Sequence, residues 1–153
     1  MRIRTYGGTT SQRSIARDAA KFVLSDALPV SSRKLANTTV YIRFVDEAEA
    51  DYYGCAYAPA ENSYVAKSYT VKINLAEAKT EKEFLETLMH ELVHVSQMAN
   101  RTVLRYTYDR SEEKYYAFWR GTKHDPDKGY SKQPWERQAF YWEKRLVKMF
   151  EAR

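Results

Sequence analysis

Two histidines and a glutamate in the segment "TLMHELVHVSQ" (87–97) have the spacing of a metal half-site. His90 and His94 are four residues apart, so on a helix they lie on one face, one turn apart. At that spacing both imidazoles can reach a single tetrahedral zinc ion. Glu91 follows the first histidine and would project beside the metal, where a carboxylate can take the proton from a water molecule that zinc activates. The pattern predicts two zinc ligands and a general base.

A catalytic zinc ion needs a third protein ligand, and the sequence offers two candidates. The pattern in which a glycine and a third histidine follow closely is absent, because Gln97 and Asn100 occupy those positions. This excludes the metzincin arrangement. The candidates are His124, in the loop "GTKHDPDKGY", and Glu136, in "QPWERQAF". A ligand near the start of a helix is held by regular structure, which favours Glu136, whereas His124 is more simply an exposed loop residue.

The same segment also has the pattern of an ordinary amphipathic helix. At about 100° per residue, Leu88, Leu92 and Val95 fall in one sector, which must pack against a core. His90 and His94 fall together in another sector. The sequence therefore predicts one helix with a core face and a separate metal-binding face.

Two helices must position these residues. Thr80 and Glu83 have the spacing of a capping box, which predicts that the histidine helix begins at about Glu81 and runs to near Asn100. The last helix opens with Pro134 in its first turn, and apolar residues follow at three- and four-residue steps.

The first half of the chain predicts one helix and several strands. The segment 11–28 has apolar residues at helical spacing, with Ser11 as the expected N-cap. Segments rich in β-branched and aromatic residues predict neighbouring, antiparallel strands at 38–45, 52–58 and 68–76. The stretch 101–133 reads as irregular. These elements together predict the α+β class.

Composition limits the domain organisation. A chain of 153 residues with 44% hydrophobic residues has the size of one domain, 1–153, with its own core. Cys55 is the single cysteine, so no intramolecular disulfide can form, and this residue is more simply a small strand residue than a nucleophile. No signal peptide and no membrane span are recognisable, so we expect a cytoplasmic protein.

The segment "HELVHVSQ", followed by an aromatic-rich stretch with "WRG" and then by "PWERQA", resembles the small zinc metallopeptidases of phages and prophages. These are similar to minimal gluzincins, and the resemblance covers roughly residues 84–143. It implies that His90, His94 and Glu136 bind one Zn²⁺ per chain and that Glu91 is the general base. It also implies hydrolysis of a protein or peptide substrate, in the host cytoplasm if the chain is phage-encoded.

The resemblance further implies a small zincin-like domain. Its elements would be an N-terminal helix, a mainly antiparallel sheet of three or more strands, the histidine helix and the C-terminal helix. SprT-like proteases are similar in the helix motif. Their third ligand is a histidine closer downstream, which this chain lacks, so a direct link to their DNA-associated roles is weakened.

Two further parts of a peptidase site are expected. The tetrahedral oxyanion needs a donor besides zinc, and Tyr130 and His124, both before the last helix, are the candidates. The strand at 68–76 could be a sheet edge to which a substrate adds as another strand, although an ordinary core strand is an equal interpretation.

Two other classes of function remain open. One is a catalytically inactive structural, virion or host-interaction module in which the motif is vestigial. The other is a basic DNA-associated protein, because the net charge is +5. The basic residues are spread through the chain, which does not favour a dedicated nucleic-acid surface. The sequence predicts no oligomeric state.

Overall fold

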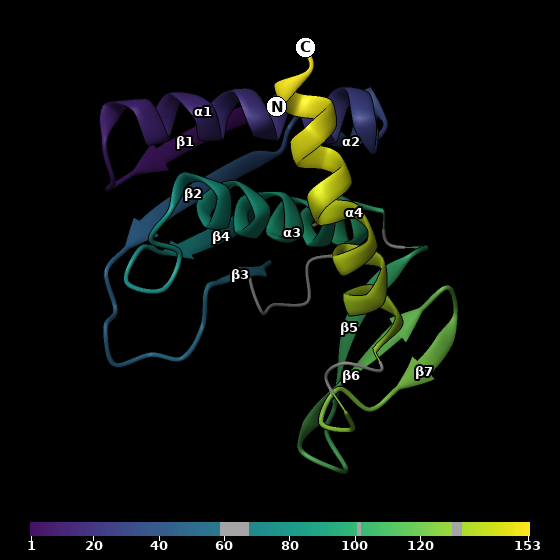
Figure 1. Cartoon of the computed structure of the whole chain (residues 1–153). Helices are drawn as coiled ribbons and strands as arrows, with labels where there is room; N and C mark the ends of the chain where they lie inside the picture. The colour runs from purple at the N-terminus through teal and green to yellow at the C-terminus, as the bar shows by residue number, and fades with distance from the viewer. Residues whose placement is uncertain (59–67, 101, 130–132) are drawn as a thin grey trace.

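The computed structural model describes residues 1–58, 68–100, 102–129 and 133–153, and it has the predicted α+β architecture (Figure 1). A four-stranded sheet carries helices, and a second sheet of three strands lies beyond the end of the histidine helix. In chain order the elements are β1 (Arg2–Tyr6), α1 (Thr10–Lys21), the π-helix η1 (Phe22–Ala27), α2 (Ser32–Leu35), β2 (Thr39–Val45), β3 (Gly54–Tyr57), β4 (Ser68–Asn74), α3 (Glu81–Ala99), β5 (Leu104–Asp109), β6 (Lys114–Trp119), β7 (Thr122–His124) and α4 (Pro134–Glu151).

The four-stranded sheet has the order β1-β2-β4-β3. Its β1–β2 and β2–β4 pairs are parallel, and only β3 pairs antiparallel, with β4. The expectation that the strands at 38–45, 52–58 and 68–76 are all antiparallel neighbours was therefore wrong for the first and third. The reason is that β3 lies between β2 and β4 in sequence but folds to the outer side of β4, which leaves β2 and β4 as direct neighbours running the same way.

The sheet buries one of its faces. Along β2 the side chains of Val40, Ile42 and Phe44 are buried, and the residues between them are partly or fully exposed. This period of two places every second side chain on one face. The apolar sides of α1 and α3 cover that face, and Leu88 and Leu92 are fully buried in the common core.

The first helix begins two residues earlier than predicted. Thr9, not Ser11, is the N-cap, because its side chain accepts a hydrogen bond from the backbone N–H of Gln12 and the Gln12 side chain accepts one from the backbone N–H of Thr9. This reciprocal capping box satisfies two backbone donors that the helix leaves free. The helical path then continues through η1 to Ala27.

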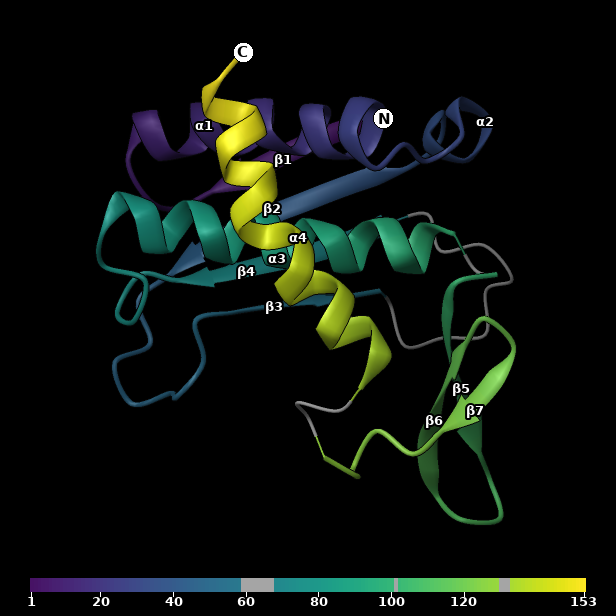
Figure 2. The same ribbon diagram turned by 45° about the vertical axis from the view of Figure 1, so that its right-hand side comes forward.

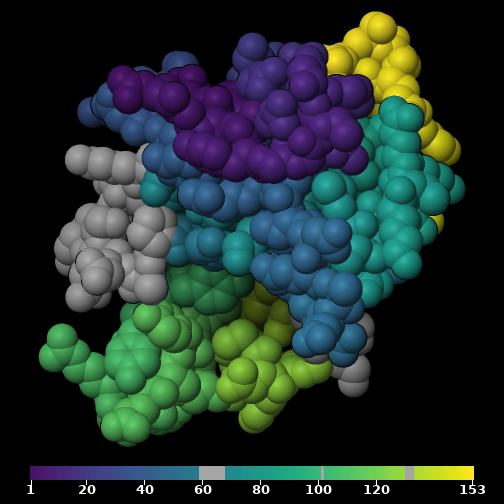
Figure 3. Space-filling model, turned by 90° about the vertical axis from the view of Figure 1, so that its left-hand side faces the viewer, coloured from purple at the N-terminus to yellow at the C-terminus, as the bar shows by residue number. Residues whose placement is uncertain are grey.

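A second, antiparallel sheet occupies the stretch that was expected to be irregular. It has the order β5-β6-β7. Leu104 and Ala117 anchor it to the core, and both are fully buried. Gly121 permits the turn between β6 and β7, where its φ of +86° falls in the left-handed region that favours glycine. In Figure 3 this sheet forms the lower part of the molecule, with a hollow between it and the segment that follows β2.

Helix α4 crosses α3 and brings the end of the chain back beside the N-terminal helices α1 and η1 (Figures 1 and 2). Its first turn lies beside the second sheet, and Trp135 and Ala139 are buried there. Among the helices of the described ranges, none is long and apolar enough to cross a bilayer.

Candidate metal centre

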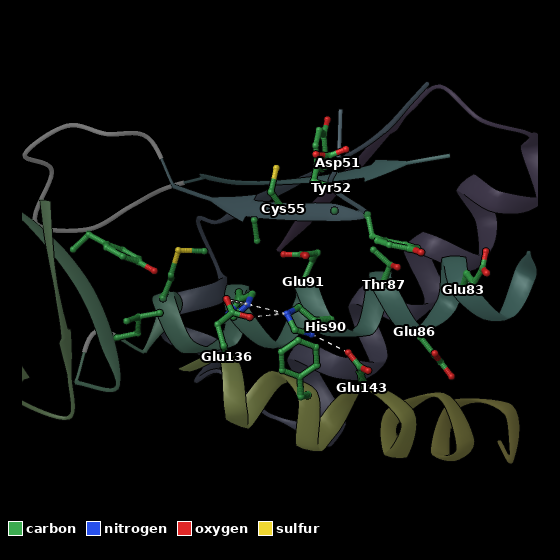
Figure 4. A pocket seen from close by; sticks show the side chains of 18 residues that line it. Asp51, Tyr52, Cys55, Glu83, Glu86, Thr87, His90, Glu91, Glu136 and Glu143 are labelled. Carbon is green, nitrogen blue, oxygen red and sulfur yellow. Dashed lines mark hydrogen bonds and ion pairs between the residues drawn. The ribbon is translucent and has the colours of Figure 1, made fainter. Parts of the chain in front are cut away.

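Three buried side chains from two helices meet between α3 and α4 (Figure 4). His90 Nε2 lies 3.1 Å from Glu136 Oε2, His94 Nε2 lies 3.0 Å from Glu136 Oε1, and the two Nε2 atoms are 3.2 Å apart. One potential ligand atom from each residue lies within 4.8 Å of the others. The structure thus brings together the three residues that the sequence singled out, although forty-two positions separate His94 from Glu136 in the sequence.

This set of donors fits a divalent metal ion. Two imidazole nitrogens and one carboxylate oxygen are the protein ligands of one class of catalytic zinc sites, which keep a fourth position open. The same donors also suit other first-row divalent ions, so the cluster by itself defines a site for a metal ion without fixing which one.

The N-terminal cap of α3 fixes where the helix begins and therefore where His90 and His94 lie along its axis. The Thr80 hydroxyl accepts a hydrogen bond of 3.1 Å from the backbone N–H of Glu83, and the Glu83 carboxylate accepts one of 3.1 Å from the N–H of Thr80. This confirms the predicted capping box and the predicted start at Glu81. The core face of the helix then sets the rotation that turns His90 and His94 toward α4.

The other nitrogen of each imidazole has a partner that sequence reasoning missed. His90 Nδ1 lies 2.9 Å from Glu143 Oε2, and His94 Nδ1 lies 2.8 Å from Gln97 Oε1. Such contacts hold the rings so that both Nε2 atoms face the centre, as in the carboxylate–histidine–metal arrangements of metalloproteins. The spacing held a signal for Glu143, because it lies two helical turns after Glu136 and therefore on the same face of α4.

Gln97 also joins the two helices. Its amide nitrogen donates hydrogen bonds to the backbone oxygen of Trp135, at 3.0 Å, and to Gln138 Oε1, at 2.8 Å. One side chain therefore orients His94 and holds the first turn of α4 against α3. These hydrogen bonds explain how Glu136 of α4 is held opposite His90 and His94 of α3.

The charges of the cluster are strongly coupled. Burial alone would lower the pKa of His90, but hydrogen bonds with Glu136 and Glu143 outweigh it and raise that pKa to about 9. Burial would raise the pKa of Glu136, but hydrogen bonds from both histidines lower it well below its usual range. Without a metal ion the cluster therefore holds a proton near neutral pH, and a metal ion must displace that proton to bind.

Glu91 is buried beside the cluster and faces the underside of β3 (Figure 4). Only 6% of the residue is exposed, and its side chain forms no hydrogen bond with any residue in the described ranges. Burial raises its pKa, and electrostatic interactions with His94 and His90 offset this only in part. A carboxylate whose pKa is shifted toward neutrality is suited to accept and return a proton.

Glycine at position 54 lets β3 approach α3 above Glu91. A Cβ atom there would lie 2.8 Å from Thr87 Cγ2 and 3.1 Å from Glu91 Cγ. The first separation is shorter than real Cβ contacts and the second is tight, so a side chain at this position would force β3 or the neighbouring side chains of α3 to move. Gly54 therefore sets the depth of the space over the general-base candidate.

A cavity of about 790 Å³ opens at the cluster. Helix α3 forms its floor, β3 and the residues before it form the roof, α4 forms one wall, and β5 closes one end. The lining residues are Asp51, Tyr52, Tyr53, Gly54, Cys55, Ala56, Glu83, Glu86, Thr87, His90, Glu91, His94, Met98, Leu104, Tyr106, Glu136, Phe140 and Glu143.

Of the two predicted oxyanion donors, His124 is absent from the described lining of the cavity. His124 lies on β7, where its ring meets the ring of Trp135 edge-on at 5.7 Å, and it does not line the cavity. Tyr130 lies outside the described residues. Tyr106, on β5, lines the cavity instead. Desolvation and, after it, the negative charge of Glu136 raise the pKa of Tyr106 to about 12, so its hydroxyl keeps its proton.

Of the two interpretations of the strand at 68–76, the structure confirms the ordinary core strand and not the sheet edge. The strand at 68–76 corresponds to β4, which lies between β2 and β3 and is not an edge. The edge strand at the cavity is β3. Its half-buried Cys55 has a pKa raised by burial and by Glu91, so this thiol is not a thiolate nucleophile at neutral pH.

Comparisons of the chain with protein-family models, with curated proteins and with solved structures found no match. The resemblance to small phage metallopeptidases therefore stays a prediction, and the function must be inferred from the site itself.

Proposed function

We propose that this protein is a zinc metallopeptidase in which His90, His94 and Glu136 bind one Zn²⁺ and Glu91 is the general base. One observation supports this most: a metal-ligand set assembled from two helices lies next to a buried carboxylate that has no hydrogen-bond partner among the described residues, in an open cavity. A structural metal site is normally closed by four protein ligands. Here three ligands and an adjacent base face a space large enough for a peptide.

The residues of the site supply the proton transfers. A zinc ion held there would act as a Lewis acid, lowering the pKa of a water molecule and polarising the scissile carbonyl. Glu91 takes the proton from the attacking water as the new carbon–oxygen bond forms. It then gives the proton to the amine as the carbon–nitrogen bond breaks. Because its pKa is raised, Glu91 can hold that proton between the two steps.

Tyr106 is our candidate for the oxyanion donor in place of Tyr130 and His124. It lines the cavity near enough to Glu136 for that charge to affect its pKa, and a neutral phenol can donate a hydrogen bond to a developing negative charge. The outer edge of β3, which pairs with no other strand of the described residues, would hold an extended substrate over α3 by pairing with its backbone.

The proposal is tested with the Glu91→Gln variant. Glutamine keeps the size of the side chain but cannot accept a proton, so we expect zinc near one per chain and peptide hydrolysis reduced by about 10² to 10⁴-fold. Zinc is measured by elemental analysis, and cleavage by mass spectrometry of a peptide mixture. Glu81→Gln, on the exposed side of the same helix, is the matched control and should cleave normally. Equal cleavage by wild type and Glu91→Gln would contradict the proposal, as would a biological role that survives Glu91→Gln unchanged.

A further inference from the structure

The lining of the cavity has a charge opposite to that of the whole chain. The chain carries a net +5, yet six carboxylates line the cavity and none of the described lining residues is lysine or arginine. Three of the six belong to the metal centre, as ligand, general base and partner of His90. The other three are Asp51, Glu83 and Glu86, and the proposed function assigns them no role.

Two of these carboxylates, Glu83 and Glu86, lie toward one end of the cavity, whereas Asp51 lies in its roof. Glu86 is one helical turn before His90, about 6 Å along the axis of α3. Figure 4 shows Glu83 and Glu86 on the side of His90 away from Glu136. Met98 lies one turn after His94, about 6 Å in the other direction. Leu104 and the ring of Tyr106 line that other end.

Of the two carboxylates at this end, Glu86 is the one that is free to meet a ligand. Its ion-pair partner among the described residues is Lys82, whose Nζ atom is 4.0 Å away on a side chain that is 79% exposed. An ion pair of this kind is weak and easily exchanged. Glu83 is also negative, but its carboxylate is held by the backbone N–H groups of Thr80 and Lys79 in the cap of α3.

We propose that the cleft selects extended peptides with a lysine or arginine on one side of the scissile bond, facing Glu86, and a large apolar residue on the other side, facing Met98. The inference rests on the proposed function for the position of the scissile bond. Glu86 and Met98 are twelve residues apart on α3, about 18 Å along its axis, and an extended chain advances about 3.3 Å per residue, so each preferred side chain lies about three residues from that bond. The carboxylate end binds the cation and the apolar end buries the second side chain.

Binding is measured with the zinc-loaded Glu91→Gln protein, which should hold peptides without cutting them. Fluorescence anisotropy compares a labelled peptide having lysine and phenylalanine on opposite sides of the central bond with a peptide in which glutamate replaces the lysine. Both orders along the chain are used. In one order, the lysine peptide should bind at least about tenfold more tightly at low salt, and 0.5 M salt should reduce this ratio severalfold. Serine in place of phenylalanine should also weaken binding.

Two charge-reversal variants make the test specific. Glu86→Lys should abolish or invert the preference for lysine, whereas Glu81→Lys, which changes the net charge equally outside the cavity, should keep it. Equal affinity for the lysine and glutamate peptides, or a preference unchanged by Glu86→Lys, would overturn the inference. Cleavage by the wild-type enzyme is scored separately. Selective binding without any cleavage would contradict the proposed function but not the binding preference. Cleavage without selective binding would contradict the binding preference but not the proposed function.

Discussion

The two faces of α3 are buried to nearly the same extent but by different means. On the core face Leu92 is 0% exposed, and on the site face His94 is 8% exposed. Leu92 is stabilised by leaving water. His94 and its neighbour His90 are polar, so their burial depends on Glu136, Glu143 and Gln97 as partners. The comparison teaches that the core face holds the fold, while the site face is stabilised by interactions that a metal ion would replace or reinforce.

The largest effects should separate these two faces. Leu92→Ala removes packed carbon from the core and should lower the free energy of unfolding by about 2–5 kcal/mol. The folded variant should still bind zinc near one per chain. His94→Ala removes a ligand and should lose the zinc. Chemical denaturation measures the free energy of unfolding, and elemental analysis measures the zinc content. If His94→Ala kept zinc near one per chain, the proposed difference between the core face and the site face would be contradicted.

The site face should respond to pH in the metal-free protein. The pKa of His90 in the folded protein is about 9, above its ordinary value of 6.5, so its contribution to stability is fully present below pH 6.5 and is lost as pH rises through 9. The loss should be at most about 3 kcal/mol. Zinc affinity should rise over the same interval, because the proton leaves more easily.

Denaturation in the presence of a chelator at pH 6.5 and pH 9 tests this. In the control His90→Asn, the free energy of unfolding should fall much less between the two pH values. The same fall in both proteins would show that other groups cause it. Glu136 has a lowered pKa, so its contribution is present above its ordinary pKa of 4.5 and is lost only in more acidic solution.

Tyr106→Phe tests the end of the cavity that β5 supplies. Removing one oxyanion donor should reduce kcat by about 10²-fold, with zinc content and stability nearly unchanged. Tyr108→Phe is a matched control on the same strand, since Tyr108 does not line the cavity. Unchanged turnover in Tyr106→Phe would return the search for the oxyanion donor to Tyr130.

Glu143→Gln should have the smallest effect on the site face. Glutamine can still contact His90 Nδ1 but without a negative charge, so zinc should bind about 10- to 100-fold more weakly. Competition with a chelator measures this affinity. Glu151→Gln, at the exposed end of α4, should bind zinc as the wild type does.

The parts of the site that could be predicted depend on regular spacing within a helix. The residues of α3 were placed by a capping box and by the angle of 100° per residue, and Pro134 placed Glu136 in the first turn of α4. Local geometry was enough because each helix carries its own hydrogen bonds. The convergence of the two helices still had to be seen in the structure.

The parts that could not be predicted depend on pairing between distant segments. β2 and β4 are direct neighbours because β3 folds to the outer side of β4, and no local sequence pattern predicts that path. In β6, "KYYAFW", large aromatic residues occur on both faces, so the alternation that marks a half-buried strand is weak. Tyr106 was missed for that reason, because its place in the cavity depends on this second sheet.

The most direct test of the account is the metal content and metal position of the protein purified without added metal. We expect zinc near one per chain, with an anomalous-scattering peak bounded by His90, His94 and Glu136, and loss of the metal in Glu136→Gln. A stoichiometric metal that remains bound in Glu136→Gln, or no metal bound by the wild type when zinc is supplied, would contradict it.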